Sequence, residues 1–227
     1  MSAASPELAG LVRALRTQPL HVLMSKYTRL IEGLNARRPD KCAHLTFAED
    51  SSEIAPNELA RVDAALVHLL RNAFDHGIES QSVRGAEGKP RDGTIRCSLH
   101  HSGDSAVLSI ADDGRGIDTQ GLVEAAIRRG IWTREKAMGS TEDERLSLMF
   151  VDRLSTREEA NELSGRGVGL PAVRAHMASI GGTLELHTQP GQGTTFTLTF
   201  PIGAASVNQG NAPSAEGSPE RPLETGE

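Results

Sequence analysis

The chain has few cysteines, few aromatic residues and no long hydrophobic run. Among its 227 residues are two Cys, one Trp, one Tyr and five Phe. No apolar run approaches the roughly 18 residues that a membrane-spanning helix needs. The opening stretch MSAASPELAG also lacks the basic and apolar regions of a signal peptide. We therefore expect a cytoplasmic protein without membrane insertion.

The scarce cysteines and the acidic balance exclude further classes of function. Cys42 and Cys97 each stand alone in apparent strand sequence, with no metal-ligand spacing around them. We expect both to be buried, reduced thiols without a functional role, rather than a disulfide or a zinc site. The net charge of −6 and the small number of aromatic rings argue against nucleic acid as the main partner.

Composition indicates one ordered domain followed by a tail. A hydrophobic fraction of 37% is enough for one sizeable core. From Ala204 onward the chain is rich in Gly, Pro, Ser and Glu, with almost nothing apolar to bury, so this tail is expected to be disordered. The expected organisation is an N-terminal extension over residues 1–14, one domain over 15–203 and the tail over 204–227.

Hydrophobic periodicity predicts an α+β fold. Helices and sequential hairpins in this order indicate a two-layer α/β sandwich, with helices packed on one face of a mixed sheet. Turn-forming sequences, HSGDS and QPGQG, join the two expected hairpins. Helices are expected near Glu7–Arg16, Leu20–Asn35, Asn57–Glu79, Thr119–Arg129, Glu142–Val151 and Val168–Ile180. Strands are expected near Ala43–Ala48, Thr94–His101, Ala106–Ala111, Thr183–Thr188 and Thr194–Phe200.

The expected helix around HLLRNAFDHGIES has an unusual polar side. At about 100° per residue, its apolar residues share one broad face. The other face carries His68, Asn72, Asp75 and His76 instead of the Lys and Glu of an ordinary solvated surface. One interpretation is a surface helix with an uncommon polar side. The other is a face turned toward a ligand, since an amide and two imidazoles offer neutral oxygen and nitrogen to a metal or a phosphate.

Three glycine-rich stretches add to this face. In ADDGRGI, Asp112 follows a strand, where its carboxylate can accept a hydrogen bond from an amino group, although an Asp-Gly pair is also a common turn. SGRGVGLPAV leads into an expected helix, whose N-terminal amides suit phosphate oxygens. GQGTTF precedes the last strand and has the composition of a hairpin turn.

The glycine spacing excludes two familiar nucleotide sites. The lid at residues 165–169 reads G-x-G-x-G and follows the polar stretch STREEANELS, whereas a Rossmann fingerprint follows a strand. No G-x-x-x-x-G-K-[ST] is present, which excludes a P-loop. In their chain order, the polar helix face, the Asp-x-Gly-x-Gly, the glycine lid and the final Gly-x-Gly-Thr make a coherent nucleotide site.

These motifs resemble the ATP-binding domain shared by gyrase B, MutL and histidine kinases, called GHKL or HATPase. HLLRNAFDHGIES, DDGRGI, SGRGVGL and GQGTTF are similar to its N box and glycine boxes. The N box wording, the FVDRLST stretch and SGRGVG look like the catalytic domain of the chemotaxis kinase CheA. The resemblance extends from about Leu15 to Ile202, and RTQPLHVLMSKYTRLIEGL resembles the family's entry helix. It implies the GHKL sandwich with a flexible ATP lid.

The resemblance implies a role for each matching residue. Asn72 would be the Mg²⁺ ligand, with His68 and His76 near the phosphates and Asp75 holding local geometry. Asp112 would bind the adenine amino group, and Gly116, beside Gly114, would permit close approach of the base. Thr194 would add a hydroxyl near the adenine. The lid residues that would close over the phosphates are Gly165, Arg166, Gly167, Val168 and Gly169.

The implied reaction is phosphoryl transfer from MgATP to a histidine on a separate phosphotransfer protein, with a response regulator as a downstream partner. None of the histidines outside the N box lies in a phosphotransfer context, so the acceptor is expected on another protein. No dimerisation helix pair is visible, so we expect a monomer or weak dimer.

The chain departs from the family at two points. FVDRLST replaces Phe-Leu-Pro-Gly-Phe-Ser-Thr, and Leu170-Pro171 replaces Met-Asp after the lid. The first departure motivates an alternative, a non-catalytic ATP-binding module that controls a partner by its nucleotide state. A serine kinase of the anti-sigma-factor type is a further alternative, although its N box more usually begins with Glu than with His.

Overall fold

The computed structural model describes residues 17–151 and 169–202. Three expectations therefore lie outside the described residues: the helix at Glu7–Arg16, the tail from Ala204 and the lid residues before Gly169. No helix within the two described ranges is long and apolar enough to cross a membrane.

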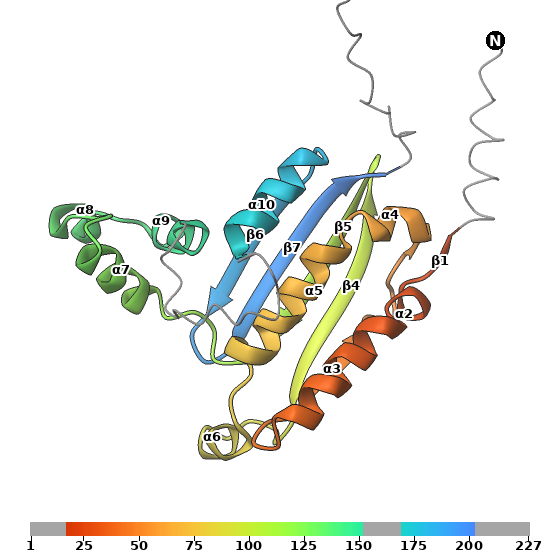
Figure 1. Cartoon of the computed structure of the whole chain (residues 1–227), viewed down its shortest axis with the longest axis horizontal. Helices are drawn as coiled ribbons and strands as arrows, with labels where there is room; N and C mark the ends of the chain where they lie inside the picture. The colour runs from red at the N-terminus through yellow and green to blue at the C-terminus, as the bar shows by residue number, and fades with distance from the viewer. Residues whose placement is uncertain (1–16, 152–168, 203–227) are drawn as a thin grey trace, which may run out of the picture.

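A five-stranded mixed sheet forms one layer of the fold (Figure 1). The strand order is β2-β4-β5-β7-β6, in which β2 and β4 are parallel and every other pair is antiparallel. A small antiparallel pair, β1 (Gln18–Pro19) with β3 (Glu53–Ile54), lies apart from it. The strands of the main sheet are β2 (Ala43–Phe47), β4 (Gly93–Ser102), β5 (Ser105–Asp112), β6 (Thr183–Gln189) and β7 (Gly193–Pro201).

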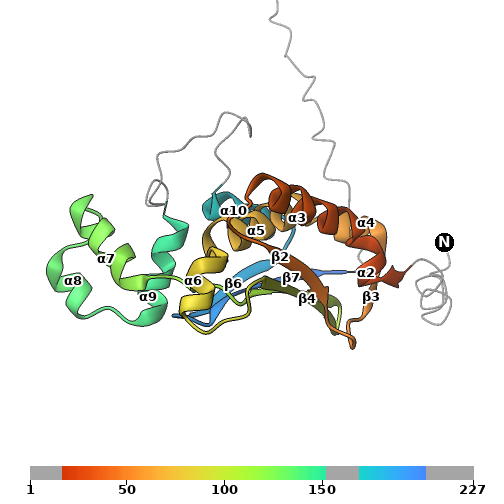
Figure 2. The ribbon, with the colours of Figure 1, turned by 90° about the horizontal axis from the view of Figure 1, so that it is seen from below.

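The helices that cover the sheet lie on one face (Figure 2). They comprise α3 (Ser25–Arg37), α5 (Asp63–Asn72) and α10 (Leu170–Ser179), with the short α2 (Leu20–Leu23) and α4 (Pro56–Ala60) at one end. This arrangement confirms the two-layer sandwich with helices on one face of a mixed sheet. Alternate residues of β5 are buried along its length, as expected for a strand with a core-facing side.

The expected helix Asn57–Glu79 is broken into three pieces. An irregular turn separates α4 from α5, and the last turn is a π-helix, η1 (Ala73–Gly77). The Ile78 amide donates to the Ala73 carbonyl across five residues, at 2.8 Å. The face assignment holds over α5, but beyond Asn72 the wider turn replaces the spacing of 100° per residue.

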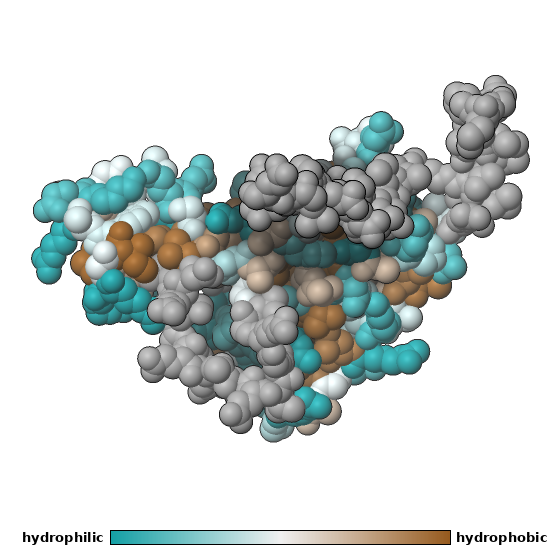
Figure 3. Space-filling model, turned by 45° about the horizontal axis from the view of Figure 1, so that its top comes forward, coloured by the Kyte–Doolittle hydropathy of each residue, from teal (hydrophilic) through white to brown (hydrophobic). Residues whose placement is uncertain are grey.

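A second lobe protrudes beside the sandwich and contains α7 (Thr119–Arg128), α8 (Arg134–Met138), α9 (Glu142–Ser147) and the 3-10 turn η2 (Leu148–Phe150). The main core joins the sheet to α3, α5 and α10, whereas the lobe has a small cluster of its own around Leu122, Ala126 and Leu148. Met149 packs against both clusters. Figure 3 shows hydrophobic side chains on the lobe, at the left of the molecule.

Two short helices and one cysteine differ from expectation. The helices α6 (Gln81–Ala86) and α8 were not expected, because neither is long enough to repeat an apolar period. Side-chain caps from Ser80 and Thr133 start them instead. Cys97 is buried as expected, but Cys42 is only partly buried because it precedes the edge strand β2.

Candidate nucleotide-binding site

Asp112 and Thr194 lie together at the end of the sheet. Asp112 is the last residue of β5 and pairs with Thr194 of β7 in the antiparallel register. Both residues are buried, with 8% and 6% of their surfaces exposed. The Thr188 hydroxyl lies 3.3 Å from the Thr194 hydroxyl. It also accepts a hydrogen bond from the Ile117 amide at 2.9 Å. A carboxylate and hydroxyls thus meet in one place that can read a polar heterocycle.

Glycine is required where the loop after β5 crosses its neighbours. A Cβ on Gly114 would lie 2.2 Å from the Gly77 carbonyl oxygen, so the Asp112 loop and the N box are in direct backbone contact. Gly116 has φ +74°, and a Cβ there would lie 2.6 Å from the Gln189 carbonyl oxygen. The Arg115 amide donates to Gly77 at 3.0 Å. The motifs predicted from separate parts of the sequence therefore form one continuous backbone surface.

Burial sets the charge state of Asp112. Desolvation raises the pKa of this carboxyl to about 6, although hydrogen bonds from the Gly114 and Thr194 amides act in the opposite direction. The Gly114 amide lies 3.0 Å from Asp112 Oδ1. Such a perturbed carboxyl in a glycine-lined site is typical of a ligand contact.

The polar residues of the N box lie on the neighbouring helix: His76 is in η1, which contacts β5 and β7, and His68 and Asn72 precede it on α5. His68 and Asn72 are half-buried, and His76 is exposed. Burial, and then the charge of His76, lower the pKa of His68, so its imidazole is neutral near pH 7 and can donate one hydrogen bond. The Asn72 amide has no side-chain hydrogen bond to any described residue. Its oxygen therefore fits Mg²⁺, which prefers oxygen ligands and retains several waters.

Lys41 anchors the N-box turn and was not identified from the sequence. Its buried ammonium donates to the carbonyls of Phe74, Asp75 and Ile78, at 3.1, 3.2 and 2.9 Å. These carbonyls belong to the end of the π-helix, where main-chain acceptors lack intrahelical partners. The Asp75 side chain itself is exposed, so the local geometry of Asp75 depends on its carbonyl and Lys41.

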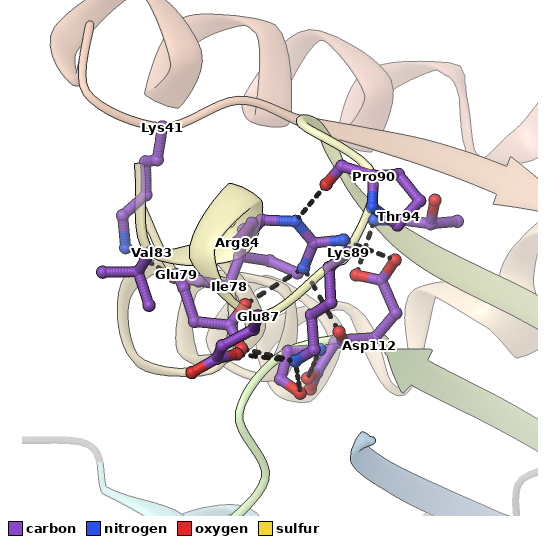
Figure 4. Close-up of polar contacts among 12 residues, drawn as sticks. Lys41, Ile78, Glu79, Val83, Arg84, Glu87, Lys89, Pro90, Thr94 and Asp112 are labelled. Carbon is purple, nitrogen blue, oxygen red and sulfur yellow. Dashed lines mark hydrogen bonds and ion pairs between the residues drawn. The ribbon is translucent and has the colours of Figure 1, made fainter. Parts of the chain in front are cut away.

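A second buried network joins the N box to the Asp112 loop (Figure 4). Arg84 is fully buried and lies between Glu79 and Asp113, at 3.0 and 2.9 Å. Its guanidinium also donates to the carbonyls of Pro90 and Asp113. Lys89 links Glu79 to the Gly114 carbonyl. Although burial alone would raise it, the pKa of Glu79 is lowered by Lys89 and Arg84.

This network escaped prediction because its members belong to three segments and half of its acceptors are main-chain carbonyls. The only signal was Glu79 at the end of the N box, followed by Arg84 and Lys89 within the next ten residues.

The lid side of the site is described only at its edges. Most of FVDRLST lies outside the described residues, and so do the lid residues Gly165, Arg166, Gly167 and Val168. Gly169 precedes α10, and Pro171 lies in its first turn, where proline is tolerated. The Arg174 guanidinium lies over the Phe150 ring, 4.6 Å from its centroid, and so fastens α10 to η2.

Comparison with known proteins identifies the family of the chain. Residues 57–204 match the family described as histidine kinase-, DNA gyrase B- and HSP90-like ATPases, so the chain belongs to that family. It is similar to the chemotaxis protein CheA of Halobacterium salinarum, with 38% identity over 200 residues, 88% of this chain and 30% of that protein. The gliding motility regulatory protein of Myxococcus xanthus is 35% identical over 199 residues, 88% of this chain and 26% of that protein.

The chain thus spans about a third of the length of the curated relatives it matches. Among solved structures, the catalytic domain of the histidine kinase ThkA aligns over 82% of this chain and 93% of that domain, with 17% identity and a TM-score of 0.47. The match to the family model and the identity to CheA proteins confirm the family resemblance drawn from the N box and the glycine boxes.

Proposed function

We propose that the chain is the MgATP-binding catalytic module of a CheA-like histidine kinase. The observation that carries the proposal is the pairing of Asp112 with Thr194 next to η1, the turn that continues the helix of His68 and Asn72. This arrangement offers an adenine contact at one end and neutral phosphate and metal contacts at the other. The similarity to CheA proteins over most of the chain supports the same function.

In the proposed reaction the protein mainly positions groups and neutralises charge. Asp112 accepts a hydrogen bond from the adenine amino group, and Gly116 lets the base lie against the backbone. Asn72 supplies an oxygen to Mg²⁺, while His68 donates to a phosphate oxygen and His76 lies nearby. Held by Asn72, a Mg²⁺ ion would supply positive charge to the phosphate oxygens. The lid residues proposed to cover the phosphates are Gly165, Arg166, Gly167, Val168 and Gly169.

The γ-phosphoryl group is proposed to pass to a histidine of a separate phosphotransfer protein. The test incubates the chain with Mg²⁺ and γ-labelled ATP, with and without a panel of histidine phosphotransfer domains. Acid-labile label is expected on one partner. The substitution Asn72→Ala is expected to lower labelling at least about a hundredfold, as when one charge-stabilising group is lost from an active site. Asn57→Ala, at an exposed position of α4, is the matched control and should label normally.

The remaining outcomes separate the alternatives. Acid-stable label on a partner would identify a serine kinase instead of a histidine kinase. ATP binding that depends on Asp112, without labelling of any partner, would contradict the kinase proposal and favour a module controlled by its nucleotide state.

A further inference from the structure

A thiol, an imidazole and a carboxylate come together at the β2 edge of the sheet. Cys42 Sγ lies 3.9 Å from His44 Nε2, and His44 Nε2 lies 3.2 Å from Asp92 Oδ2. One ligand atom from each of the three residues lies within 4.8 Å of the other two. Among the residues that the structure describes, no other group of three His, Cys, Asp or Glu side chains meets this criterion.

The backbone of the parallel β2–β4 pair holds the cluster together. Ala43 pairs with Gly93, and the Gly93 amide donates to the Cys42 carbonyl at 2.8 Å. Cys42 and Asp92 therefore stand at the same level, immediately before the two strands. His44 lies two residues beyond Cys42 and so projects from the same face of β2. The sequence separates the ligands by 48 residues, which is why no metal-ligand spacing was visible there.

A further side chain orients the carboxylate. Gln81 Nε2 donates to Asp92 Oδ1 at 2.9 Å, which leaves Oδ2 directed toward His44. An outer hydrogen bond that fixes a carboxylate in this way is typical of metal sites.

The distances fit tetrahedral coordination by sulfur, nitrogen and oxygen. With Zn–S about 2.3 Å and Zn–N about 2.1 Å, tetrahedral ligand atoms lie roughly 3.6 Å apart. The sulfur–nitrogen separation of 3.9 Å is close to this value. With Zn–O also about 2.1 Å, the expected nitrogen–oxygen separation is roughly 3.4 Å, and the observed one is 3.2 Å. We propose that Cys42, His44 and Asp92 form a binding site for a thiophilic divalent cation, foremost Zn²⁺, with water as the fourth ligand. Mg²⁺ is not the ligand proposed, because it prefers oxygen donors alone.

Binding changes the protonation of one group. The Cys42 thiol becomes a metal-bound thiolate and releases its proton to solvent, while His44 binds as the neutral imidazole. The ion reaches the site from solvent, since the side chains of His44 and Asp92 are 63% and 41% exposed. The site is separate from the proposed Mg²⁺ ligand Asn72, which lies on α5.

Cobalt spectroscopy on the reduced full-length chain tests the proposal. Titration with Co²⁺ as a probe for Zn²⁺ should saturate at one ion per chain and produce a thiolate-to-cobalt charge-transfer band. Zn²⁺ should abolish the band, and excess Mg²⁺ should not. Cys42→Ser should eliminate the band, and His44→Ala and Asp92→Asn should each weaken binding at least about tenfold. Cys97→Ala and Asn72→Ala are the matched controls and should retain the band.

Thiol protection gives a second measurement on the unsubstituted protein. Zn²⁺ should slow the reaction of Cys42 with a thiol reagent, while the buried Cys97 stays unreactive in both conditions. The proposal is overturned if no charge-transfer band develops at Co²⁺ concentrations up to about 1 mM. A band that survives Cys42→Ser, or a Cys42 thiol that Zn²⁺ does not protect, would overturn it equally.

Discussion

At the scale of single residues, burial gives Asp112 an unusual charge state. Its carboxyl titrates near pH 6 because it is buried at the end of β5. An adenine amino group donates a hydrogen bond and therefore favours the ionised carboxylate. In the proposed site, nucleotide binding and deprotonation of Asp112 are coupled.

This coupling predicts that ATP affinity falls as the pH drops through about 6. Below that value the dissociation constant should rise by up to about tenfold per pH unit. ATP titrations between pH 5 and 8 would measure the dissociation constant. In Asp112→Asn the carboxyl is absent, so the pH dependence of this variant shows the effect of protonating the ATP phosphates. The variant should bind more weakly at pH 7 and have the shallower pH dependence. Equal slopes in the two proteins would show that Asp112 does not contact the base.

The same pKa has a consequence for stability without nucleotide. The folded state holds a proton on Asp112 up to about pH 6, whereas the unfolded chain releases it near its ordinary value of 3.8. The free energy of unfolding therefore falls as the pH rises between these values, by up to about 3 kcal/mol. Denaturant titrations at both ends of this range should show a smaller fall in Asp112→Asn.

Arg84 holds the N box and the Asp112 loop together. Removing it would leave Glu79 buried without one of its two cationic partners. Loss of one member of a buried ion pair typically costs about 3–5 kcal/mol. Arg84→Met should lower the free energy of unfolding by this amount in urea denaturation, whereas Arg29→Met on the exposed side of α3 should change it by less than about 0.5 kcal/mol. A small effect of Arg84→Met would mean that water replaces the guanidinium.

At the scale of elements, the sequence predicted long periodic segments well and short or irregular ones poorly. The strands were found because β-periodicity and turn residues agree over each hairpin. The π-turn was not found, because η1 depends on Lys41, which is more than 30 residues away, to bind its carbonyls. Asp112 and Thr194 could be proposed from motifs, but their pairing required the β5–β7 register.

The turn between β6 and β7 offers a matched pair of glycines. Gly191 has φ +74° and open space around a Cβ, so Gly191→Ala should cost only about 1–2 kcal/mol of backbone strain. Gly193 has φ +110°, and a Cβ there would lie 1.8 Å from the Asp112 carbonyl oxygen. Gly193→Ala should therefore be clearly more destabilising and should also weaken ATP binding, because it displaces Asp112. Thermal unfolding and nucleotide titration of both variants would check this, and equal losses would contradict it.

At the scale of the whole molecule, the buried residues form a large core in the sandwich and a small one in the lobe. The main core extends across the sheet and three helices, whereas the lobe of α7, α8, α9 and η2 buries few residues and meets the main core at Met149 and Phe150. Composition predicted enough apolar residues for one sizeable core but could not reveal this division. It depends on which helices pack together, and a 3.6-residue period does not specify the neighbour.

The unequal cores predict that the lobe unfolds before the sandwich. Few buried contacts give a segment a low free energy of local opening. Trp132, the single tryptophan of the chain, packs against the lobe cluster and reports on it alone. In urea its fluorescence should change at a lower concentration than the far-ultraviolet circular dichroism, which follows the sheet and larger helices. Coincident transitions would instead indicate one cooperative unit.

Two substitutions would show which core unfolds in the fluorescence transition and which in the dichroism transition. Leu148 is buried in the lobe and Leu66 in the main core, with 1% and 0% of their surfaces exposed. Replacing a buried leucine by alanine costs about 2–5 kcal/mol. Leu148→Ala should therefore move the fluorescence transition to lower urea and leave the dichroism transition nearly in place. Leu66→Ala should move both, because Met149 and Phe150 of the lobe pack against the core of the sandwich. The reverse pattern would mean that the lobe is the more stable part and that the sandwich depends on it.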